Sequence, residues 1–452
     1  MWTMVPILAE IVQHSAFVFT EPTFVTFRQV LLGWIMCLGG RTEYRVFQTI
    51  QADEEISGQT RHPFDRFYNF FSRASWEVSA LARWLAVEIV TKLCPTGPLT
   101  LLVDDTLLHK RGLHVFGLGW FRDAVASTKK RVATASGNNW VVVGLAISIP
   151  LCPERVFCLP LLARLRLPGK GKASCATLAR EMLVEVQAWF PGRALLLVGD
   201  GGYAGSALLK DLPAAVTYVG RTRADAALYD PKPKRTAGQR GPKPKKGERL
   251  PCPKEAAKKA DRNRSGKGPW CWQPLSVILY GVARELKVLS YVAVWPTVLG
   301  LRPVLIVVVR DATGTMQDTY LFTTDLQAPL AWVVTTFGMR WSIEVAFKAS
   351  KQVMDVEGPQ HWCEESVRRL APWVWLMQSL VSLWYLTGGN ECEAAKKEAS
   401  LMGAWDSAWS LRHMLKVLRR ATLDETININ SAESGDLRDI VETLKNIVNL
   451  AA

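Results

Sequence analysis

Apolar residues recur at helical spacing through the first 95 residues of the chain. Phe24, Phe27, Leu31 and Ile35 follow one another at intervals of three or four residues, which places their side chains on one face of a helix. The same spacing returns around Phe67 and continues towards residue 95. We therefore predict a helical N-terminal region over residues 1–95.

The pattern changes after the cluster Cys94-Pro-Thr-Gly-Pro, where short apolar runs replace the helical stripe. Apolar runs bounded by proline and glycine are typical of buried strands. One helical stretch, residues 173–190, stands between these runs, an order that favours an α/β domain. The predicted strands of this part of the chain are residues 99–103, 140–149, 156–162, 194–198 and 215–219.

A second group of strand-like runs follows, and the chain then returns to helical spacing. The uncharged stretch 370–390 contains Pro372, Gln378 and Ser379, so we interpret it as a buried helix and not as a membrane span. The strands of this second group are residues 276–280, 286–294, 304–309 and 319–323, and the helical patterns cover residues 330–354 and 362–452.

The positive charge of the chain is concentrated in one segment. The formal net charge is +14, and residues 231–268 contain fourteen Lys and Arg against three acidic residues, which leaves +3 for the rest of the chain. This proline-rich, lysine-rich composition cannot form a hydrophobic core, so we predict a loop that binds a polyanion, most simply nucleic acid. The alternative is a solvated basic loop that only aids solubility.

Composition also limits the compartment and the class of protein. Hydrophobic residues make up 49% of the chain and charged residues 21%, which excludes disorder of the whole chain. The N-terminus has no positive flank typical of a secretory signal, and the nine cysteines show neither Cys-x-x-Cys pairs nor zinc-ligand spacing. We expect reduced thiols in a cytoplasmic protein with no membrane partner.

Aspartates directly follow two of the predicted strands. Asp104 and Asp105 come after residues 99–103, and Asp200 comes after residues 194–198. The carboxyl ends of neighbouring strands meet at one edge of an α/β sheet, so we expect these acids to lie close together, where they could share a divalent cation. Each aspartate also has an ordinary interpretation as a turn or helix-cap residue.

A third acid, Glu344, lies in the helical pattern that follows. Arg340 and Lys351 share its stripe if the helix is continuous, and they could neutralise phosphate oxygens while Glu344 binds metal. Gly338 and Ser342 could instead break the helix near Arg340, with Ser342 as the cap and Glu344 in the first turn. An ordinary i,i+4 ion pair between Arg340 and Glu344 is the alternative interpretation.

Taken in order, these residues resemble the DDE transposases of bacterial insertion sequences, in the cut-and-paste branch with the signature Tyr-x2-Arg-x3-Glu-x6-Lys. Arg340, Glu344 and Lys351 match that spacing, and Phe337 stands in the position of the tyrosine. The first aspartate motif resembles Asp104-Asp105-Thr106 followed by Lys110-x-Gly112, and the second resembles Asp200-x-x-Tyr203. Three motifs in this order make the resemblance specific over residues 61–351.

The resemblance implies an α/β fold with an RNase H-like catalytic core, a mixed five-stranded sheet with helices. A strand-rich insertion interrupts this core, and helical N-terminal and C-terminal regions flank it. The implied division is a helical DNA-binding domain (1–95), the first part of the core (96–225), the insertion domain (226–325) with the basic loop 231–268, the second part of the core with the glutamate helix (326–360) and a helical C-terminal region (361–452).

The resemblance also implies the activity. It predicts a DNA transposase that binds the terminal inverted repeats of an insertion sequence as a homodimer on paired double-stranded ends. Cleavage and strand transfer would depend on magnesium and pass through a DNA hairpin. The implied ligands of two Mg²⁺ ions, for which Mn²⁺ can substitute, are Asp105, Asp200 and Glu344, and Asp104 stays open as the alternative to Asp105.

Two further sets of residues follow from the resemblance and from the basic segment. The expected contacts to DNA phosphates are Arg340, Lys351, Lys348, Phe337, Tyr203, Lys110, Lys243, Lys245 and Lys246. Aromatic faces can stack on an extruded base, and the candidates for this role are Trp270, Trp272 and Trp295. Core packing is the alternative role for each of these tryptophans.

Two rival interpretations come from other classes. A haloacid-dehalogenase-like phosphohydrolase needs a second acid two positions after its nucleophile, where this chain has Thr106 or Leu107, so the pattern excludes it. A catalytically inactive, DNA-binding relative that represses transposition is compatible with Phe337, although the three acids argue against it. No serine-hydrolase or ATP-binding motif is present in the sequence.

Overall fold

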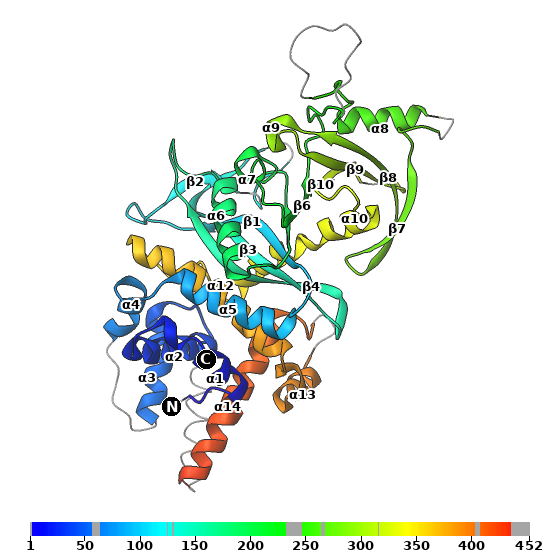
Figure 1. Ribbon diagram of the computed structural model, residues 1–452. Helices are drawn as coiled ribbons and strands as arrows, with labels where there is room; N and C mark the ends of the chain where they lie inside the picture. Colours follow the sequence, from blue (N-terminus) through cyan, green and yellow to red (C-terminus); the bar gives the residue numbers. More distant parts are fainter. Residues whose placement is uncertain are drawn as a thin grey trace.

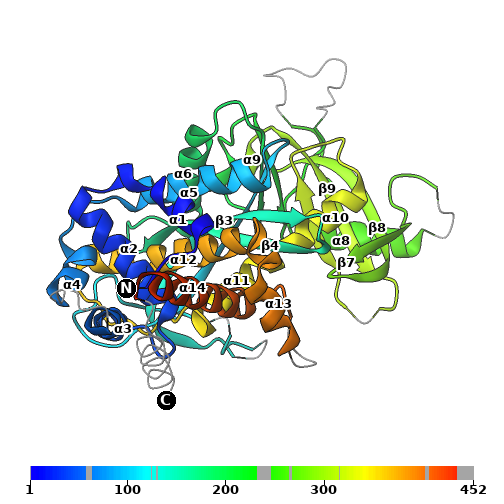
Figure 2. The ribbon, with the colours of Figure 1, turned by 90° about the horizontal axis from the view of Figure 1, so that it is seen from below.

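The structure is a computed structural model that describes residues 2–56, 64–123, 125–128, 131–231, 246–263, 267–314, 316–402 and 407–434. It is a mixed α/β fold, as predicted, in which one large sheet extends from a helical body into a strand-rich lobe (Figure 1). Figure 2, seen from below, shows the helical body on one side of the molecule and strands β7 to β9 on the other.

The first part of the sheet contains the two aspartate-bearing strands. Its order is β4 (Cys152–Arg166), β3 (Thr134–Ile149), β1 (Leu99–His109), β5 (Leu195–Gly199) and β6 (Val216–Arg221). The β4–β3 and β3–β1 pairs are antiparallel, whereas the β1–β5 and β5–β6 pairs are parallel. The short strand β2 (Gly119–Arg122) pairs with the start of β3. All five strands predicted in this part of the sequence are therefore confirmed.

Helix α6 (Cys175–Trp189) connects β4 to β5 and allows β5 to run parallel to β1. It begins where the sequence supplies a cap, because the Ser174 hydroxyl accepts a hydrogen bond from the Thr177 amide at 3.1 Å. Its apolar stripe, which includes Leu178, Met182 and Val186, is buried. The next helix, α7 (Ser206–Leu209), is a single turn between β5 and β6.

The strands of the predicted insertion continue the same sheet. Strand β10 (Thr319–Thr323) pairs antiparallel with β6, and β9 (Pro303–Asp311), β8 (Val282–Val294) and β7 (Gln273–Leu279) follow outward. The four strands predicted for this region are confirmed. The short helix α9 (Pro296–Leu299) lies between β8 and β9.

The basic segment is only partly a loop. Residues 253–262 form helix α8 (Pro253–Arg262), which corrects the prediction of a loop throughout residues 231–268. The reason is a stripe of small residues: Ala256, Ala257 and Ala260 are buried against Leu289 and Val308 in a small core of the insertion. The lysines and arginines of α8 can therefore face solvent while its alanines pack. Residues 232–245 lie outside the described residues.

The helical regions at the two ends of the chain share one hydrophobic core with the sheet. Trp34 of α2 packs edge-on against Trp373 of α12, with ring centroids 4.8 Å apart, and Phe71 of α4 contacts the same indole. The helices of this body are α1 (Pro6–Gln13), α2 (Glu21–Met36), α3 (Glu43–Ile56), α4 (Phe64–Ser72), α5 (Val78–Leu93), α12 (Glu364–Leu386), α13 (Glu393–Ser400) and α14 (Leu411–Ser434), with 3-10 turns at Ala16–Val18 and Gly389–Glu391. The helical character predicted for both regions is confirmed in their described residues, and residues 57–63, 403–406 and 435–452 lie outside these.

Helix α12 contains most of the uncharged stretch 370–390 and is almost entirely buried, with Pro372 inside it. It packs against β4 and against helices of both end regions. None of the helices in the described part of the chain is long and apolar enough to cross a membrane. The nine cysteines are free thiols, as expected.

Candidate active site

The two adjacent aspartates of β1 point to different partners, because successive side chains of a strand alternate between its faces. Asp104 faces helix α11 (Trp341–Gln352): its Oδ2 accepts a hydrogen bond of 2.6 Å from Arg340 Nη1, immediately before that helix. Asp105 accepts hydrogen bonds from Asn139 Nδ2 at 3.1 Å and from Tyr203 Oη at 3.3 Å. Only Asp104 is thus linked to the glutamate helix in this structure.

Asp200 follows β5 at the carboxyl end of a strand that runs parallel to β1. A tight turn holds it, since the Gly202 amide donates to Asp200 Oδ1 at 2.7 Å. A Cβ atom at position 202 would lie 3.1 Å from that oxygen, so a larger residue there would push the Asp200 carboxylate slightly aside. The charge of Asp200 acts on both Asp104 and Asp105, so the structure brings the three aspartates to one sheet edge.

Glu344 reaches the same place from the other side. Helix α10 (Leu330–Met339) ends and α11 begins at Arg340, and Glu344 lies in the first turn of α11, as one of the two sequence alternatives proposed. Ser342 does not cap the helix; its hydroxyl donates back to the Met339 carbonyl at 2.8 Å. Glu344 accepts a hydrogen bond of 2.6 Å from Arg340 Nη2.

Arg340 therefore links the acids. Its guanidinium bonds Asp104 and Glu344 at once, and it lies within electrostatic reach of Asp200. Burial raises the pKa of the Asp104 carboxyl to about 7, while Arg340 opposes the rise and Asp200 adds to it. Removal from solvent also raises the pKa of Asp105, and the hydrogen bonds from Asn139 and Tyr203 oppose that rise. Such displaced pKa values in one cluster are characteristic of functional sites.

The acids have the right chemistry for a divalent cation. In the described residues, no group of three or more His, Cys, Asp and Glu side chains lies close enough to hold one metal ion together. Asp104 and Glu344 nevertheless converge on a single cationic group, the Arg340 guanidinium. Carboxylate oxygens are the ligands that Mg²⁺ and Mn²⁺ prefer, so the donor chemistry of Asp104, Asp200 and Glu344 suits these ions, although the spacing of these acids in the structure does not form a closed metal site.

The expected phosphate-binding residues differ in their freedom to reach DNA. Lys348 is exposed on α11. Lys351 donates to the Leu107 carbonyl at 2.6 Å, and this bond ties α11 to β1. Lys110 is buried and donates to two carbonyls, and burial lowers its pKa to about 8. Tyr203 is buried beside Asp105.

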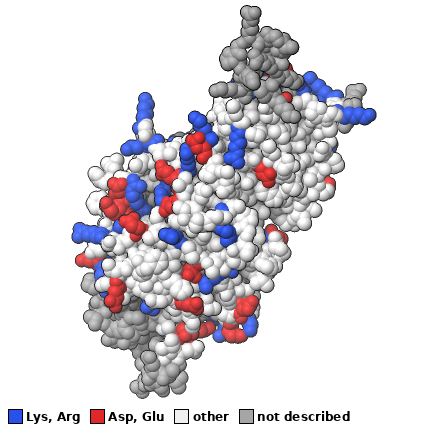
Figure 3. Space-filling view, in the orientation of Figure 1, with Lys and Arg blue, Asp and Glu red and all other residues white. Residues whose placement is uncertain are grey.

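Phe337 lies on α10, and the Arg340 guanidinium is 5.9 Å from the centre of its ring. In the basic segment, Lys246 lies over the Tyr229 ring at 3.7 Å. Lys243 and Lys245 lie outside the described residues. Figure 3 shows basic side chains gathered near α8, whereas acidic and basic side chains are mixed over the helical body.

The three candidate tryptophans lie in the insertion. Trp295 is buried in the main core against Phe322. Trp272 is partly exposed, with its indole nitrogen bonded to Asp261 and the Arg310 guanidinium 4.4 Å from its ring centre. Trp270 is also partly exposed and packs against Tyr291 and Lys259 in the small core of the insertion, so these two keep more accessible surface than Trp295. 

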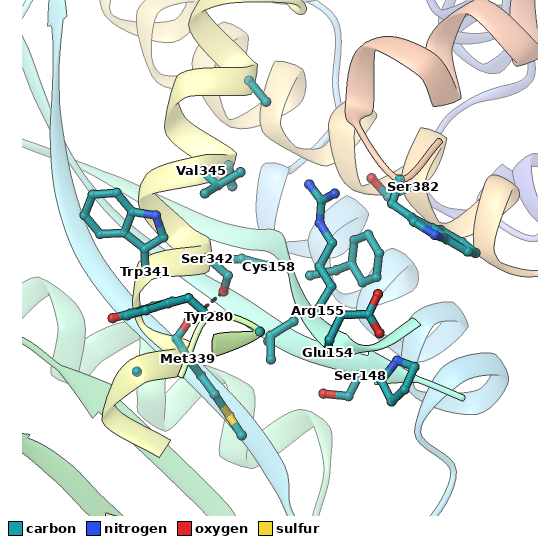
Figure 4. Close-up of a pocket in the computed structure, with 18 of the residues that line it drawn as sticks. Ser148, Glu154, Arg155, Cys158, Tyr280, Met339, Trp341, Ser342, Val345 and Ser382 are labelled. Atoms are coloured by element: carbon teal, nitrogen blue, oxygen red, sulfur yellow. Dashed lines mark hydrogen bonds between the residues drawn. The ribbon is translucent and has the colours of Figure 1, made fainter. Parts of the chain in front are cut away.

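Sequence reasoning missed two exposed aromatic residues beside the acids. Tyr280 (66% exposed) and Trp341 (53% exposed) line a hollow of about 720 Å³ between the β7–β8 turn, the start of α11 and the β3–β4 turn (Figure 4). Partial burial raises the pKa of Tyr280, which also senses the charges of Arg340 and Glu344. The only sequence signal was Tyr280-Gly281 between two apolar runs, and both residues have positive φ, as a two-residue hairpin turn requires.

The chain is similar to a known family in sequence and to a solved protein in structure. The sequence model of the family described as DDE superfamily endonuclease matches residues 18–283, which include β1 and β5 with their aspartates and end before α10 and α11. Among solved structures, the chain is similar to one titled "Cryo-EM structure of piggyBac transposase synaptic complex with hairpin DNA (SNHP)", with 12% identity and a TM-score of 0.41 over 100% of this chain and 84% of that chain. No curated protein sequence matches the chain.

Proposed function

Because the chain belongs to the DDE superfamily of endonucleases, we propose that it is a DNA transposase that cuts the ends of an insertion sequence and joins them to a target. The observation that carries this proposal is the meeting of Asp104, Glu344 and Asp200 around Arg340 at one sheet edge. Three acids from distant parts of the sequence, with a cation among them, suit phosphodiester chemistry.

The sheet topology supports an RNase H-like core. Three antiparallel strands, β4–β3–β1, continue into the parallel strands β5 and β6, which gives the mixed five-stranded sheet expected for that core. The first acid lies on its central strand, the second follows the neighbouring parallel strand, and the third comes from a helix after the insertion. This is the order in which the sequence motifs occur.

For the first acid we propose Asp104 in place of Asp105. Asp104 and Glu344 already bind one guanidinium, whereas Asp105 is held by Asn139 and Tyr203. Tyr203 belongs to the same short turn as Asp200, so its bond to Asp105 fixes that turn against β1. Asp105 would then position Asp200 and would not bind metal itself.

We propose that Asp104, Asp200 and Glu344 hold two Mg²⁺ ions, with Mn²⁺ able to substitute. Bound there, these ions would supply the charge that activates the attacking oxygen and stabilises the leaving oxygen during an in-line displacement. The chain itself orients the acids: Tyr203 and the Gly202 amide hold the Asp200 turn, and Lys351 fixes α11 on β1. Arg340 and Lys348 provide positive charge for DNA phosphates.

We propose that the insertion and the basic segment 231–268 grip double-stranded DNA. The segment contains most of the net charge of the chain, and α8 presents its share of those cations beside Trp270 and Trp272. Part-exposed tryptophans can hold an extruded base, which would support a hairpin intermediate. A homodimer on paired ends and a cytoplasmic, nucleoid-bound location follow from the same proposal.

Cleavage of the gene's own flanking DNA tests the proposal. The purified chain would be incubated with Mg²⁺ and a labelled duplex containing any inverted repeats that flank the gene. We expect strand cleavage that is lost in Asp200→Asn and Glu344→Gln, with DNA binding retained. The matched control is Glu364→Gln, which removes an acid from another i,i+4 arginine pair, on α12.

The same experiment separates the alternative function. If the wild-type chain binds the repeats but never cuts them, with either Mg²⁺ or Mn²⁺, the protein is a DNA-binding repressor of transposition and not a transposase. If Glu364→Gln loses cleavage as completely as Glu344→Gln does, the acid cluster is not the active site.

A further inference from the structure

Arg340 occupies the position between two acids where a cation is needed. Its Nη1 lies 2.6 Å from Asp104 Oδ2, and its Nη2 lies 2.6 Å from Glu344 Oε1. The side chain of Arg340 is 17% exposed and that of Asp104 is 16% exposed, so water screens this pairing only weakly. A cation that binds Asp104 Oδ2 and Glu344 Oε1 has to displace the guanidinium from these two oxygens.

The guanidinium is not fully satisfied in this position. Its Nε–H is buried and has no hydrogen-bond partner among the described residues. A buried donor without an acceptor is destabilising, which offsets part of what the two charged hydrogen bonds contribute. The position of the guanidinium therefore depends mainly on its bonds to the two carboxylates, and a stronger ligand for the carboxylates or for the guanidinium would release it.

The local backbone allows the side chain to leave. Arg340 is not in the interior of a helix; it is the junction residue at which α10 ends and α11 begins. The Phe337 ring lies on one side of the guanidinium, and the exposed Lys348 lies two turns further along α11. A DNA phosphate near this helix would offer Arg340 an anionic partner in place of the acids.

We propose that Arg340 competes with the divalent cation for Asp104 and Glu344 in the DNA-free chain, and that a DNA phosphate removes this competition by binding the guanidinium. This inference rests on the proposed function, because it takes the three acids as the metal ligands. DNA and cation then assist each other's binding. By linkage, the factor by which DNA tightens cation binding equals the factor by which the cation tightens DNA binding.

The acid cluster would therefore bind the divalent cation only weakly until DNA is bound. Coupling free energies of this kind are typically about 1–3 kcal/mol, so we expect DNA to tighten cation binding by about tenfold. Removal of the guanidinium should give the same gain without DNA. Arg340 would thus stabilise the acid cluster in the DNA-free chain and bind a DNA phosphate in the complex.

Titration of free Mn²⁺ by electron paramagnetic resonance tests this on the full-length chain, without any activity measurement. We expect Arg340→Gln to bind Mn²⁺ about tenfold more tightly than wild type when no DNA is present. The control is Arg221→Gln, which removes the same charge from an exposed residue beside the Asp200 turn without removing a bond to the acids. Its Mn²⁺ affinity should change by less than about twofold.

A second arm adds a duplex that contains the inverted repeats flanking the gene. It should tighten Mn²⁺ binding about tenfold in wild type and leave Arg340→Gln nearly unchanged. Equal affinities of wild type and Arg340→Gln, or an equal gain in Arg221→Gln, would overturn the competition. Circular dichroism establishes that each variant is folded, and Arg340→Lys, which keeps the charge, serves as the second variant.

These measurements distinguish an error in the role of Arg340 from an error in the proposed active site. If wild type binds Mn²⁺ equally with and without the duplex, and Glu344→Gln abolishes the binding, the acids are the metal site and only the role of Arg340 is wrong. If no variant binds Mn²⁺ in a way that Glu344→Gln abolishes, even with DNA present, the proposed active site itself is wrong and the inference falls with it.

Discussion

Replacement of the two adjacent aspartates of β1 one at a time should separate metal ligation from positioning. In Asp105→Asn the new amide still offers an oxygen to the Tyr203 hydroxyl. Asn139 can turn its own amide so that its oxygen faces the new NH₂ group. Both hydrogen bonds of the wild-type site then survive in neutral form.

In Asp105→Asn, two hydrogen bonds to a charged acceptor become two neutral hydrogen bonds, which sets the size of the expected effect on stability. A hydrogen bond to a charged acceptor contributes about 1.5–3 kcal/mol and a neutral one about 1 kcal/mol, and the variant no longer places a charged carboxylate there. We expect Asp105→Asn to change the free energy of unfolding by less than about 1 kcal/mol, because removal of the buried charge offsets the weaker hydrogen bonds. Its cleavage rate should fall by about tenfold, at the low end of the range for residues that orient metal ligands.

Asp104→Asn should behave differently. It removes one of two anions that Arg340 bonds, and it removes a proposed metal ligand. We expect cleavage to fall by at least about 10²–10³-fold, the usual loss when direct electrostatic stabilisation is removed. Single-turnover cleavage of the labelled duplex in Mg²⁺, with urea unfolding of each variant, measures both effects. Abolished cleavage in Asp105→Asn together with active Asp104→Asn would refute the assignment.

Two further results are expected from the contacts described above, and a third from the basic sequence of residues 231–268. Tyr203→Phe removes the hydroxyl bonded to Asp105 and should lower the free energy of unfolding by about 1–2 kcal/mol in urea; no loss would mean that the bond does not hold the Asp200 turn. Burial lowers the pKa of Lys110 to about 8, so the unfolded chain binds more protons between pH 8 and about 10.4; stability relative to Lys110→Met should therefore rise with pH across that window by up to about 3 kcal/mol, and parallel pH curves of the two proteins would contradict this. Simultaneous replacement of Lys243, Lys245 and Lys246 by glutamine should reduce the slope of log affinity for DNA against log salt by about 3, measured by fluorescence anisotropy; an unchanged slope would show that these lysines do not contact phosphate.

The sequence was sufficient for the elements and for part of the site. Apolar runs bounded by proline and glycine predicted the strands of the sheet, because strands buried on both faces read as continuous hydrophobic segments. The spacing of Arg340 and Glu344 left an i,i+4 ion pair open as the alternative interpretation, and the structure contains that pair. These are local signals, since each is decided within a few residues of the chain.

Longer-range features were not predictable in the same way. Asp104 and Asp105 follow Leu101-Leu102-Val103, all buried, so no alternation of polar and apolar residues showed which aspartate faces α11. Lys110 resembled an available cation, yet β1 places its ammonium group against the carbonyls of Glu357 and Pro359, far away in sequence. Helix α8 was missed because its buried face consists only of Pro253 and three alanines, and a lysine-rich composition conceals so small an apolar stripe.

The backbone ladder between β6 and β10 has a mechanical consequence. Leu321, Phe322 and Thr323 pair with Arg221, Gly220 and Val219, so the insertion is joined to the acid-bearing sheet as firmly as one strand is joined to the next. Swinging the insertion as a hinged arm would require rupture of those hydrogen bonds. A duplex that contacts both the acids and the insertion would therefore have to bend or unstack to fit a fixed distance between them. The deformability of the DNA would then influence which ends are cut.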